Sequence, residues 1–173
     1  QEPEETILKG AKEGNNAFLV VGDALSATTH IDLMMRAQKL GIETEIIHNA
    51  SILTAVSETG LQLYKFGKIA SMPKWQENFT PDSFMKTVQE NISMKAHSLI
   101  LCDIGLDFPD ALKQLVQTAQ NHKISLKKII VCQCLGDERR QWPFSTTVQY
   151  FLILCPVLKR LQFPLHGFER LLH

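Results

Sequence analysis

The expected fold rests on residues 17–41, which read AFLVVGDALSATTHIDLMMRAQKLG. Residues 17–21 are all apolar and are closed by Gly22 and Asp23. A short apolar run that ends in a glycine and a polar residue is typical of a buried parallel strand followed by a loop. The stretch therefore predicts a strand over residues 17–21 and a polar loop at its carboxyl end.

A helix is expected directly after this loop. Thr29 and Asp32 have the spacing of a capping box, in which side chains satisfy the first N–H groups of a helix. Apolar residues recur over positions 31–40 and form a wide face, and Gly41 stands where a helix commonly ends. The sequence thus predicts a strand, a loop and a helix in succession.

The same alternation continues along the chain. The further expected strands are 43–48, 97–103 and 128–134, and the further expected helices are 52–58 with Ser51 as its cap, one introduced by Thr80 and Pro81, and 109–120. Strands separated by helices predict an α/β fold with a mainly parallel, helix-covered sheet and functional residues at the carboxyl ends of its strands. We expect a first lobe over residues 1–79 and a smaller α/β second lobe over residues 80–173.

Composition excludes several classes of protein. Lys and Arg total 18 and Asp and Glu total 18 among 173 residues, so no excess charge points to nucleic acid or a membrane surface. The apolar run 150–158 contains Pro156 and falls short of the roughly 20 residues that span a bilayer. The acidic start is not expected to be a signal peptide, and the four cysteines lie in apolar runs, where burial is favoured over a metal site. We expect a cytoplasmic protein without bound metal.

Two polar loops are the candidates for chemistry. Residues 22–30 combine a glycine, a carboxylate, three hydroxyl groups and an imidazole between the first strand and helix. Asp23 would accept a hydrogen bond from a ligand amine or hydroxyl, although it and the threonines would equally serve as helix caps. Residues 48–52 form a second polar loop, and the string GLQLYKFG follows at 60–67.

These three segments together resemble the diphthine synthases, which carry a Gly-Asp-Pro…Ala-Thr-Thr-His loop, a His-Asn-Ala-Ser-Ile loop and the run Gly-Leu-Gln-Leu-Tyr-Lys-Phe-Gly in the same order. The corresponding residues here are Gly22-Asp23 with 27–30, 48–52 and 60–67. The resemblance implies a tetrapyrrole-methylase-like fold, in which the cofactor S-adenosyl-L-methionine lies between two α/β domains. It further implies methylation of the amino group of a modified histidine on translation elongation factor 2, and a homodimer.

The resemblance also implies a set of cofactor-binding residues. They are Asp23, Ser26, Ser51, Ile52, Cys102, Leu135 and His166. Cys102 and Leu135 would act through shape and backbone. The acceptor amine must lose a proton, for which His30 and His48 are candidates because imidazole titrates near neutral pH. The alternative for either histidine is a hydrogen bond to the backbone alone.

Three departures from the family pattern leave other functions open. Family members begin with a strand and a Gly-Leu-Gly-Leu-type loop, and no such segment precedes Gln1 in this sequence. The first lobe is therefore expected to be truncated. Ala24 replaces the usual proline, and the segment after Ile104 is shorter than in the family. The alternatives are a truncated, non-catalytic homologue or binding module, and a tetrapyrrole or ribosomal RNA methyltransferase of the same fold.

Overall fold

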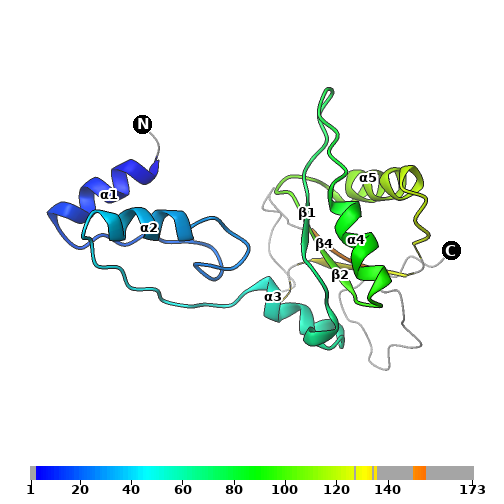
Figure 1. Cartoon of the computed structure of the whole chain (residues 1–173), viewed down its shortest axis with the longest axis horizontal. Helices are drawn as coiled ribbons and strands as arrows, with labels where there is room; N and C mark the ends of the chain where they lie inside the picture. Colours follow the sequence, from blue (N-terminus) through cyan, green and yellow to red (C-terminus); the bar gives the residue numbers. More distant parts are fainter. Residues whose placement is uncertain (1–2, 127, 134, 136–149, 155–173) are drawn as a thin grey trace, which may run out of the picture. The chain divides into compact units, whose positions relative to one another are not determined.

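The computed structural model describes residues 3–126, 128–133, 135 and 150–154. The chain divides into two compact units, Gln1–Ala55 and Val56–His173 (Figure 1). The boundary expected after residue 79 separates a cofactor-binding lobe from a second lobe. Division of the chain into compact units does not test which part binds the cofactor, so this boundary stays a prediction.

The first unit is built on two longer helices. α1 spans Pro3–Glu13, α2 spans Ile31–Lys39, and the short α3 spans Ile52–Ala55. Leu8 of α1 packs against Leu33 and Ala37 of α2, and the three side chains are buried. The sequence reasoning did not predict α1. The sequence signal for α1 is the apolar pair Ile7 and Leu8 in an otherwise polar stretch. These two side chains form a core only when they pack against α2.

α2 ends as expected and begins differently. Gly41 has φ 70°, and the N–H of Ile42 reaches the carbonyl of Ala37, which is a Schellman motif. At the start, His30 occupies the N-cap position and no side-chain cap is made there. The predicted capping box of Thr29 and Asp32 is wrong, because the backbone carbonyl of Thr29 receives the N–H of Asp32 in place of its hydroxyl.

Residues 17–21 and 43–48 do not form the predicted strands. Both segments lie outside the named elements, and Leu19, Val21 and Ile47 are strongly exposed. An apolar run becomes a strand only when a neighbouring strand accepts its backbone hydrogen bonds. In the described part of the first unit these two segments have no ladder between them.

The second unit carries a four-stranded sheet. Its elements are η1 Val56–Thr59, η2 Leu63–Lys65, β1 Ala70–Met72, α4 Phe84–Ser93, β2 Ser98–Cys102, α5 Phe108–Asn121, β3 Ile129–Gln133 and β4 Tyr150–Leu154. The strand order is β1-β2-β4-β3. β1 runs parallel to β2, and β4 is antiparallel to both β2 and β3. β1, β2 and β3 therefore point the same way, and their carboxyl ends lie at one edge of the sheet.

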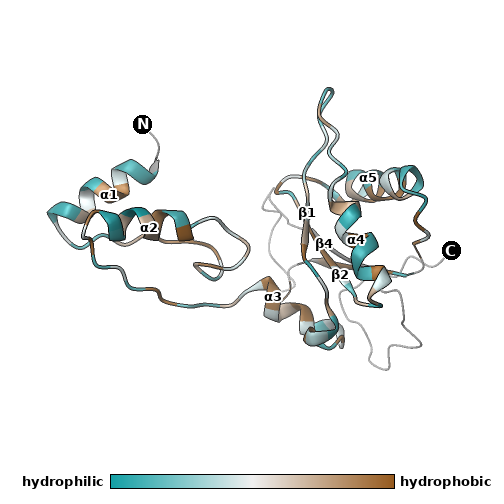
Figure 2. Ribbon diagram, in the orientation of Figure 1, coloured by the Kyte–Doolittle hydropathy of each residue, from teal (hydrophilic) through white to brown (hydrophobic). Residues whose placement is uncertain are grey.

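α4 and α5 cover this sheet with their apolar faces. Every residue of β2 is buried, which suits a central strand between β1 and β4. Met85 and Val88 of α4 and Leu115 of α5 join the same core cluster as Ile100 of β2. Figure 2 shows the matching pattern, with hydrophobic colour along the strands and mixed colour along the two helices. The α/β class and the helix-covered sheet are confirmed.

The strands expected at 97–103 and 128–134 and the helix expected at 109–120 are confirmed within a few residues. The helix expected after Thr80 and Pro81 begins later, because Ser83 is the N-cap of α4. The carbonyl of Pro81 accepts the indole N–H of Trp75 at 3.0 Å, so it is engaged outside the helix. In Figure 1 the connection between β1 and α4 extends from the sheet as a two-limbed loop.

Candidate functional site

The first polar loop and the second meet at the carboxylate of Asp23. Its Oδ1 accepts hydrogen bonds from the N–H of Leu25 and the hydroxyl of Ser26, each at 3.0 Å. Its Oδ2 accepts from Nδ1 of His48 at 2.8 Å and from the N–H of Asn49 at 3.2 Å. Residues 22–26 and 48–49 are thus brought together although 25 positions separate Asp23 from His48.

The surroundings of Asp23 favour its charged form. The side chain is only 8% exposed, and four donors face it. The hydrogen bond from the backbone of Leu25, followed by those from His48 and Asn49, holds the pKa of Asp23 well below its ordinary value. Asp23 is therefore a carboxylate throughout the physiological pH range.

The two serines of the predicted site each keep part of their hydrogen-bonding capacity. Ser26 donates its hydroxyl hydrogen to Asp23, which leaves the oxygen as an acceptor. Ser51 accepts the N–H of Leu53 at 3.1 Å as the N-cap of α3, as predicted, which leaves its hydroxyl hydrogen as a donor. Ile52 is the first residue of α3 and is half-buried.

The two histidine candidates differ in their surroundings. Nδ1 of His30 lies 2.9 Å from the carbonyl of Ala24, and the ring packs edge-on against Phe18. His48 binds Asp23 through Nδ1, and its side chain is 69% exposed. In the neutral tautomer of a ring that donates from Nδ1 to a carboxylate, Nε2 is the hydrogen-bond acceptor. Of the two, His48 is the histidine oriented by an anion, and His30 supports the first loop from within.

Two more predicted residues lie at the carboxyl edge of the sheet. Cys102 ends β2 and Leu135 follows β3, two strands that point the same way. Cys102 is fully buried, and burial raises the pKa of its thiol to about 12, so the thiol stays protonated at neutral pH. Beside it, the N–H of Asp103 donates to the carbonyl of Met72 at 3.0 Å.

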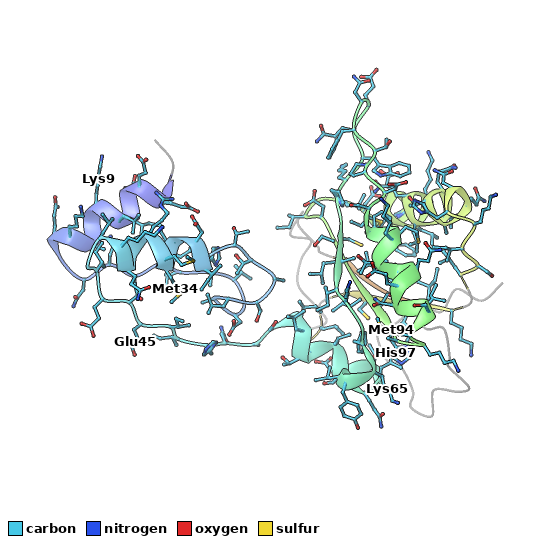
Figure 3. The ribbon with its side chains drawn as sticks, in the orientation of Figure 1. Lys9, Met34, Glu45, Lys65, Met94 and His97 are labelled. Carbon is cyan, nitrogen blue, oxygen red and sulfur yellow. The ribbon has the colours of Figure 1, made fainter. Side chains whose placement is uncertain are left out.

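The run 60–67 leads into the opposite edge of the same sheet. The N–H of His97 donates to the carbonyl of Lys65 at 2.8 Å, and the N–H of Gly67 donates to the carbonyl of His97 at 2.9 Å. Figure 3 labels Lys65 and His97 in this part of the second unit. Asn91 of α4 is buried, and its side chain binds both backbone groups of Lys68. The string 60–67 is therefore anchored at its end by backbone hydrogen bonds to His97.

His166 lies outside the described residues. Within the described ranges, no cluster of three or more histidine, cysteine or acidic side chains is placed to hold a metal ion. Over the same ranges, no helix is long and apolar enough to cross a membrane.

Sequence reasoning missed the backbone N–H of Asn49 as a partner of Asp23, and it missed Asn91 altogether. For Asn49 the available signal was its place directly after the predicted strand 43–48. For Asn91 the signal was weak, because a single amide on a helix gives no hint of burial until the helix is docked.

Comparison with known proteins identifies the family to which this chain belongs. Residues 1–149 match the family of tetrapyrrole (corrin/porphyrin) methylases, and the chain belongs to this family. Within it, the resemblance to diphthine synthases is confirmed by sequence. The chain is 51% identical over 100 residues to the diphthine methyl ester synthase of Homo sapiens, and 49% identical over 100 residues to that of Aspergillus fumigatus.

These alignments cover 58% of this chain and 35% of each relative, so the chain spans about a third of the length of the curated relatives it matches. Superposition on solved structures covers more of this chain than these sequence alignments do. A putative diphthine synthase from Entamoeba histolytica superposes with a TM-score of 0.77 at 30% identity, covering 90% of this chain and 71% of that one. A diphthine synthase at 24% identity gives a TM-score of 0.73 and shares the fold.

Proposed function

We propose that the protein is an S-adenosyl-L-methionine-dependent methyltransferase of diphthamide biosynthesis, acting on translation elongation factor 2. The observation that carries the proposal is the joining of loops 22–30 and 48–52 at Asp23, because these loops hold the family-like motifs. The identity of about half to the diphthine methyl ester synthases supports it.

The residues of these loops suit a cofactor with a polar rim. Ser51 has a hydroxyl hydrogen to donate and Ser26 has lone pairs to accept, and such groups match ribose hydroxyls and an amino-acid end. Small residues at 22, 24, 27 and 50 leave the backbone open to close approach. We assign the cofactor wall to the loops that carry Asp23, Ser26, Ser51 and Ile52.

The remaining cofactor contacts are proposed on the family likeness. Cys102 and Leu135 would supply shape and backbone groups from the carboxyl edge of the sheet, where ligands of α/β proteins commonly bind. His166 would add a further contact. Cytoplasmic location and assembly as a homodimer belong to the same proposal.

When bound, S-adenosyl-L-methionine would supply an electrophilic methyl group to a nucleophile aligned with the bond between that methyl carbon and the sulfonium sulfur. The protein has to position the acceptor, exclude water and take up one proton when the acceptor is an amine. We assign the proton to Nε2 of His48, because Asp23 orients its ring and would stabilise the imidazolium.

The name of the curated relatives, diphthine methyl ester synthase, suggests a second chemical class of methyl acceptor. A diphthine methyl ester carries a methyl group on a carboxyl oxygen. A carboxylate is already deprotonated at neutral pH and its methylation needs no base. We therefore propose an amine and a carboxylate oxygen as acceptors, of which only the amine depends on His48.

Calorimetric titration of the full chain with S-adenosylhomocysteine tests the proposal. We expect saturable binding, and much weaker binding of ATP, which shares the adenosine but replaces the amino-acid end with phosphates. Binding of ATP at equal affinity, or no binding of S-adenosylhomocysteine, would reject the assignment. Transfer of labelled methyl groups to elongation factor 2 would then separate an enzyme from the alternative of a non-catalytic binding homologue.

A further inference from the structure

We propose that the loop 73–83 is a preformed arm that binds the protein substrate through Phe79 and Glu77, and that Gln114 is the positioning residue that holds the arm in place. The loop connects β1 to α4 and extends from the sheet with two limbs (Figure 1). The identity of the partner rests on the proposed function, whereas the build of the arm does not.

The two limbs of the arm are tied to each other at two levels. At the tip, the N–H of Gln76 donates to the carbonyl of Phe79 at 2.9 Å, and the N–H of Phe79 donates to the carbonyl of Gln76 at 3.1 Å, which closes a tight turn. Nearer the base, the indole N–H of Trp75 donates to the carbonyl of Pro81 at 3.0 Å. A loop that is ordered before its partner arrives binds at a lower entropy cost.

The first limb is fixed to α5 by one buried amide. Gln114 is 5% exposed. Its Nε2 donates to the carbonyl of Pro73 at 3.0 Å, and its Oε1 accepts the N–H of Trp75 at 3.0 Å. The side chain thus bonds to the backbone of the arm as a neighbouring strand would. Loss of this side chain would leave two backbone groups of the arm without their partners.

The second limb is fixed to the end of the same helix. Oδ2 of Asp82 lies 2.7 Å from Nε2 of His122, and His122 is the C-cap residue of α5. Both limbs therefore depend on one rigid helix, through Gln114 on one side and His122 on the other.

The arm rises from the carboxyl edge of the sheet. It begins directly after β1, whose Met72 pairs with Cys102 of β2. The N–H of Lys74 lies 3.4 Å from Oδ2 of Asp103, and the ammonium group of Lys74 donates to the carbonyl of Gly105 at 3.1 Å. Cys102 is one of the residues proposed to contact the cofactor. A partner bound to the arm would therefore be held at the edge of the sheet where methyl transfer is proposed.

The tip of the arm presents an aromatic ring close to an acidic group. Phe79 is 57% exposed, and Glu77, two positions away, is also exposed. Aromatic anchors dominate the binding energy of many protein interfaces, and charges at the rim add selectivity and speed association. The complementary surface is an apolar pocket beside a lysine or arginine. We assign this surface to the protein substrate, because a second copy of the chain bound here would cover the edge at which the acceptor has to arrive.

Two variants test the contact at the tip. Phe79→Ala removes the ring and Glu77→Gln removes the charge, both at exposed positions where unfolding is not expected. Met94→Ala is the matched control for the ring, because Met94 is 59% exposed outside the arm. Glu58→Gln is the control for the charge, at another exposed position of the second unit. Biolayer interferometry measures the affinity for elongation factor 2 that carries the modified but unmethylated histidine, and calorimetry measures the affinity for S-adenosylhomocysteine.

We expect Phe79→Ala to weaken binding of elongation factor 2 about tenfold. Glu77→Gln should weaken it about threefold and make it less sensitive to salt. Both variants should bind S-adenosylhomocysteine as the unaltered chain does, and the two controls should change neither affinity. If Phe79→Ala binds the elongation factor as before, the proposal is overturned. Loss of self-association in that variant, seen by ultracentrifugation, would then assign the tip to a contact between copies of this chain.

Gln114→Leu tests the positioning residue, because it removes both hydrogen bonds and keeps an apolar side chain of similar size. Gln117→Leu is the control, since Gln117 is an exposed amide of the same helix that bonds to Asn121. We expect the amide of Trp75 to exchange about tenfold faster in Gln114→Leu and to stay unchanged in Gln117→Leu. Trp75→Phe, which removes the bond between the limbs, gives a second loosened arm if Gln114→Leu does not fold.

A double-mutant cycle separates positioning from direct contact. If Gln114 acts through the arm, Gln114→Leu weakens binding of elongation factor 2, and the double variant with Phe79→Ala binds no more weakly than Phe79→Ala alone. Losses that multiply in the double variant, or an unchanged affinity in both Gln114→Leu and Trp75→Phe, would overturn the positioning role.

Failure of the arm and failure of the proposed function give different results. If the unaltered chain binds S-adenosylhomocysteine, and elongation factor 2 either does not bind or binds independently of Phe79, the arm is rejected and the methyltransferase assignment stands. If the unaltered chain does not bind S-adenosylhomocysteine and Phe79→Ala still weakens binding of the elongation factor, the arm stands and the methyltransferase assignment is rejected.

Discussion

The carboxylate of Asp107 accepts a hydrogen bond from the N–H of Asp110 at 3.1 Å and caps the start of α5. Asp107→Ala should lower the free energy of unfolding by about 1 kcal/mol, because the first turn of the helix loses the acceptor for one N–H group. Urea unfolding followed by circular dichroism measures this. Lys113→Ala, at an exposed position of the same helix, is the control and should change stability far less.

His97 is a buried histidine at the start of the sheet. Its ring lies edge-on to Phe66, and Nδ1 is buried with no hydrogen-bond partner among the described residues. Burial, with a smaller contribution from the charge of Lys65, lowers the pKa of His97 below its ordinary value of 6.5. The folded protein therefore holds this imidazole neutral.

The pH dependence of stability follows from this shift. Below about pH 6.5 the unfolded chain takes up a proton at His97 that the folded chain refuses, so unfolding becomes easier as pH falls towards the lowered pKa. Above that pH the histidine is neutral in both states and makes no such contribution. His97→Leu should flatten the fall in stability between pH 7 and pH 5, as measured by urea unfolding. An equally steep fall in His97→Leu would contradict this reading.

At the scale of elements, Gly67 explains the last position of the string 60–67. A Cβ built on Gly67 would collide with Oδ1 of Asn91 and come within 3.2 Å of the Cβ of Ala96. Asn91 is buried and holds Lys68 and Ser98 through hydrogen bonds, so it is not free to move aside. The glycine lets the segment approach α4.

Gly67→Ala should therefore lower the free energy of unfolding by about 2 kcal/mol, the usual loss when a methyl group is forced into a packed site. Thermal and urea unfolding would measure it. Gly14→Ala is the matched control, since a Cβ there meets nothing within 4 Å. A loss as small as that of the control would show that Asn91 yields.

The elements differ in how far the sequence predicted them. α5 has Asp107 as its cap, Pro109 in its first turn and an apolar stripe, and all three local signals agree with the observed helix. The start of α4 was placed too early, because Pro81 is held by the indole of Trp75. The hydrogen bond from the Trp75 indole to the Pro81 carbonyl belongs to no helix-capping motif, so capping rules do not predict it.

At the scale of the whole molecule, the two units differ in how their backbones are paired. The second unit has a ladder of four strands, with Ile100 paired to Leu152, which also pairs with Val131. In the first unit, residues 17–21 and 43–48 lie outside any ladder among the described residues. Exchange of backbone amides depends on such pairing.

Native-state hydrogen exchange should therefore separate the units. We expect the amides of Ile100 and Val131 to be protected by at least about a hundredfold more than those of Leu19 and Ile47. Mass spectrometry of peptic fragments would measure the difference, with fragments of α5 as an internal reference for stable helix. Equal protection of residues 17–21 and of β2 would contradict the absence of strand pairing.

The sequence by itself determined the family, the α/β class and, in the second unit, the helices α4 and α5 and the strands β2 and β3, whereas it predicted neither β1 nor β4. These depend on local patterns, namely apolar runs, caps and the strings at 22–30, 48–52 and 60–67. It also identified Asp23 and His48 as functional candidates, because both stand in polar loops after apolar runs.

Only the tertiary structure decided whether a favourable segment became a strand and what a candidate residue binds. Residues 17–21 have the pattern of a strand but pair with no other strand among the residues that the structure describes, whereas Ala70–Met72 has little pattern and pairs with β2. The acceptor sites of Asp23 are filled by groups from two loops. The physical reason is the same in both cases, since backbone and carboxylate hydrogen bonds are satisfied by partners remote in sequence.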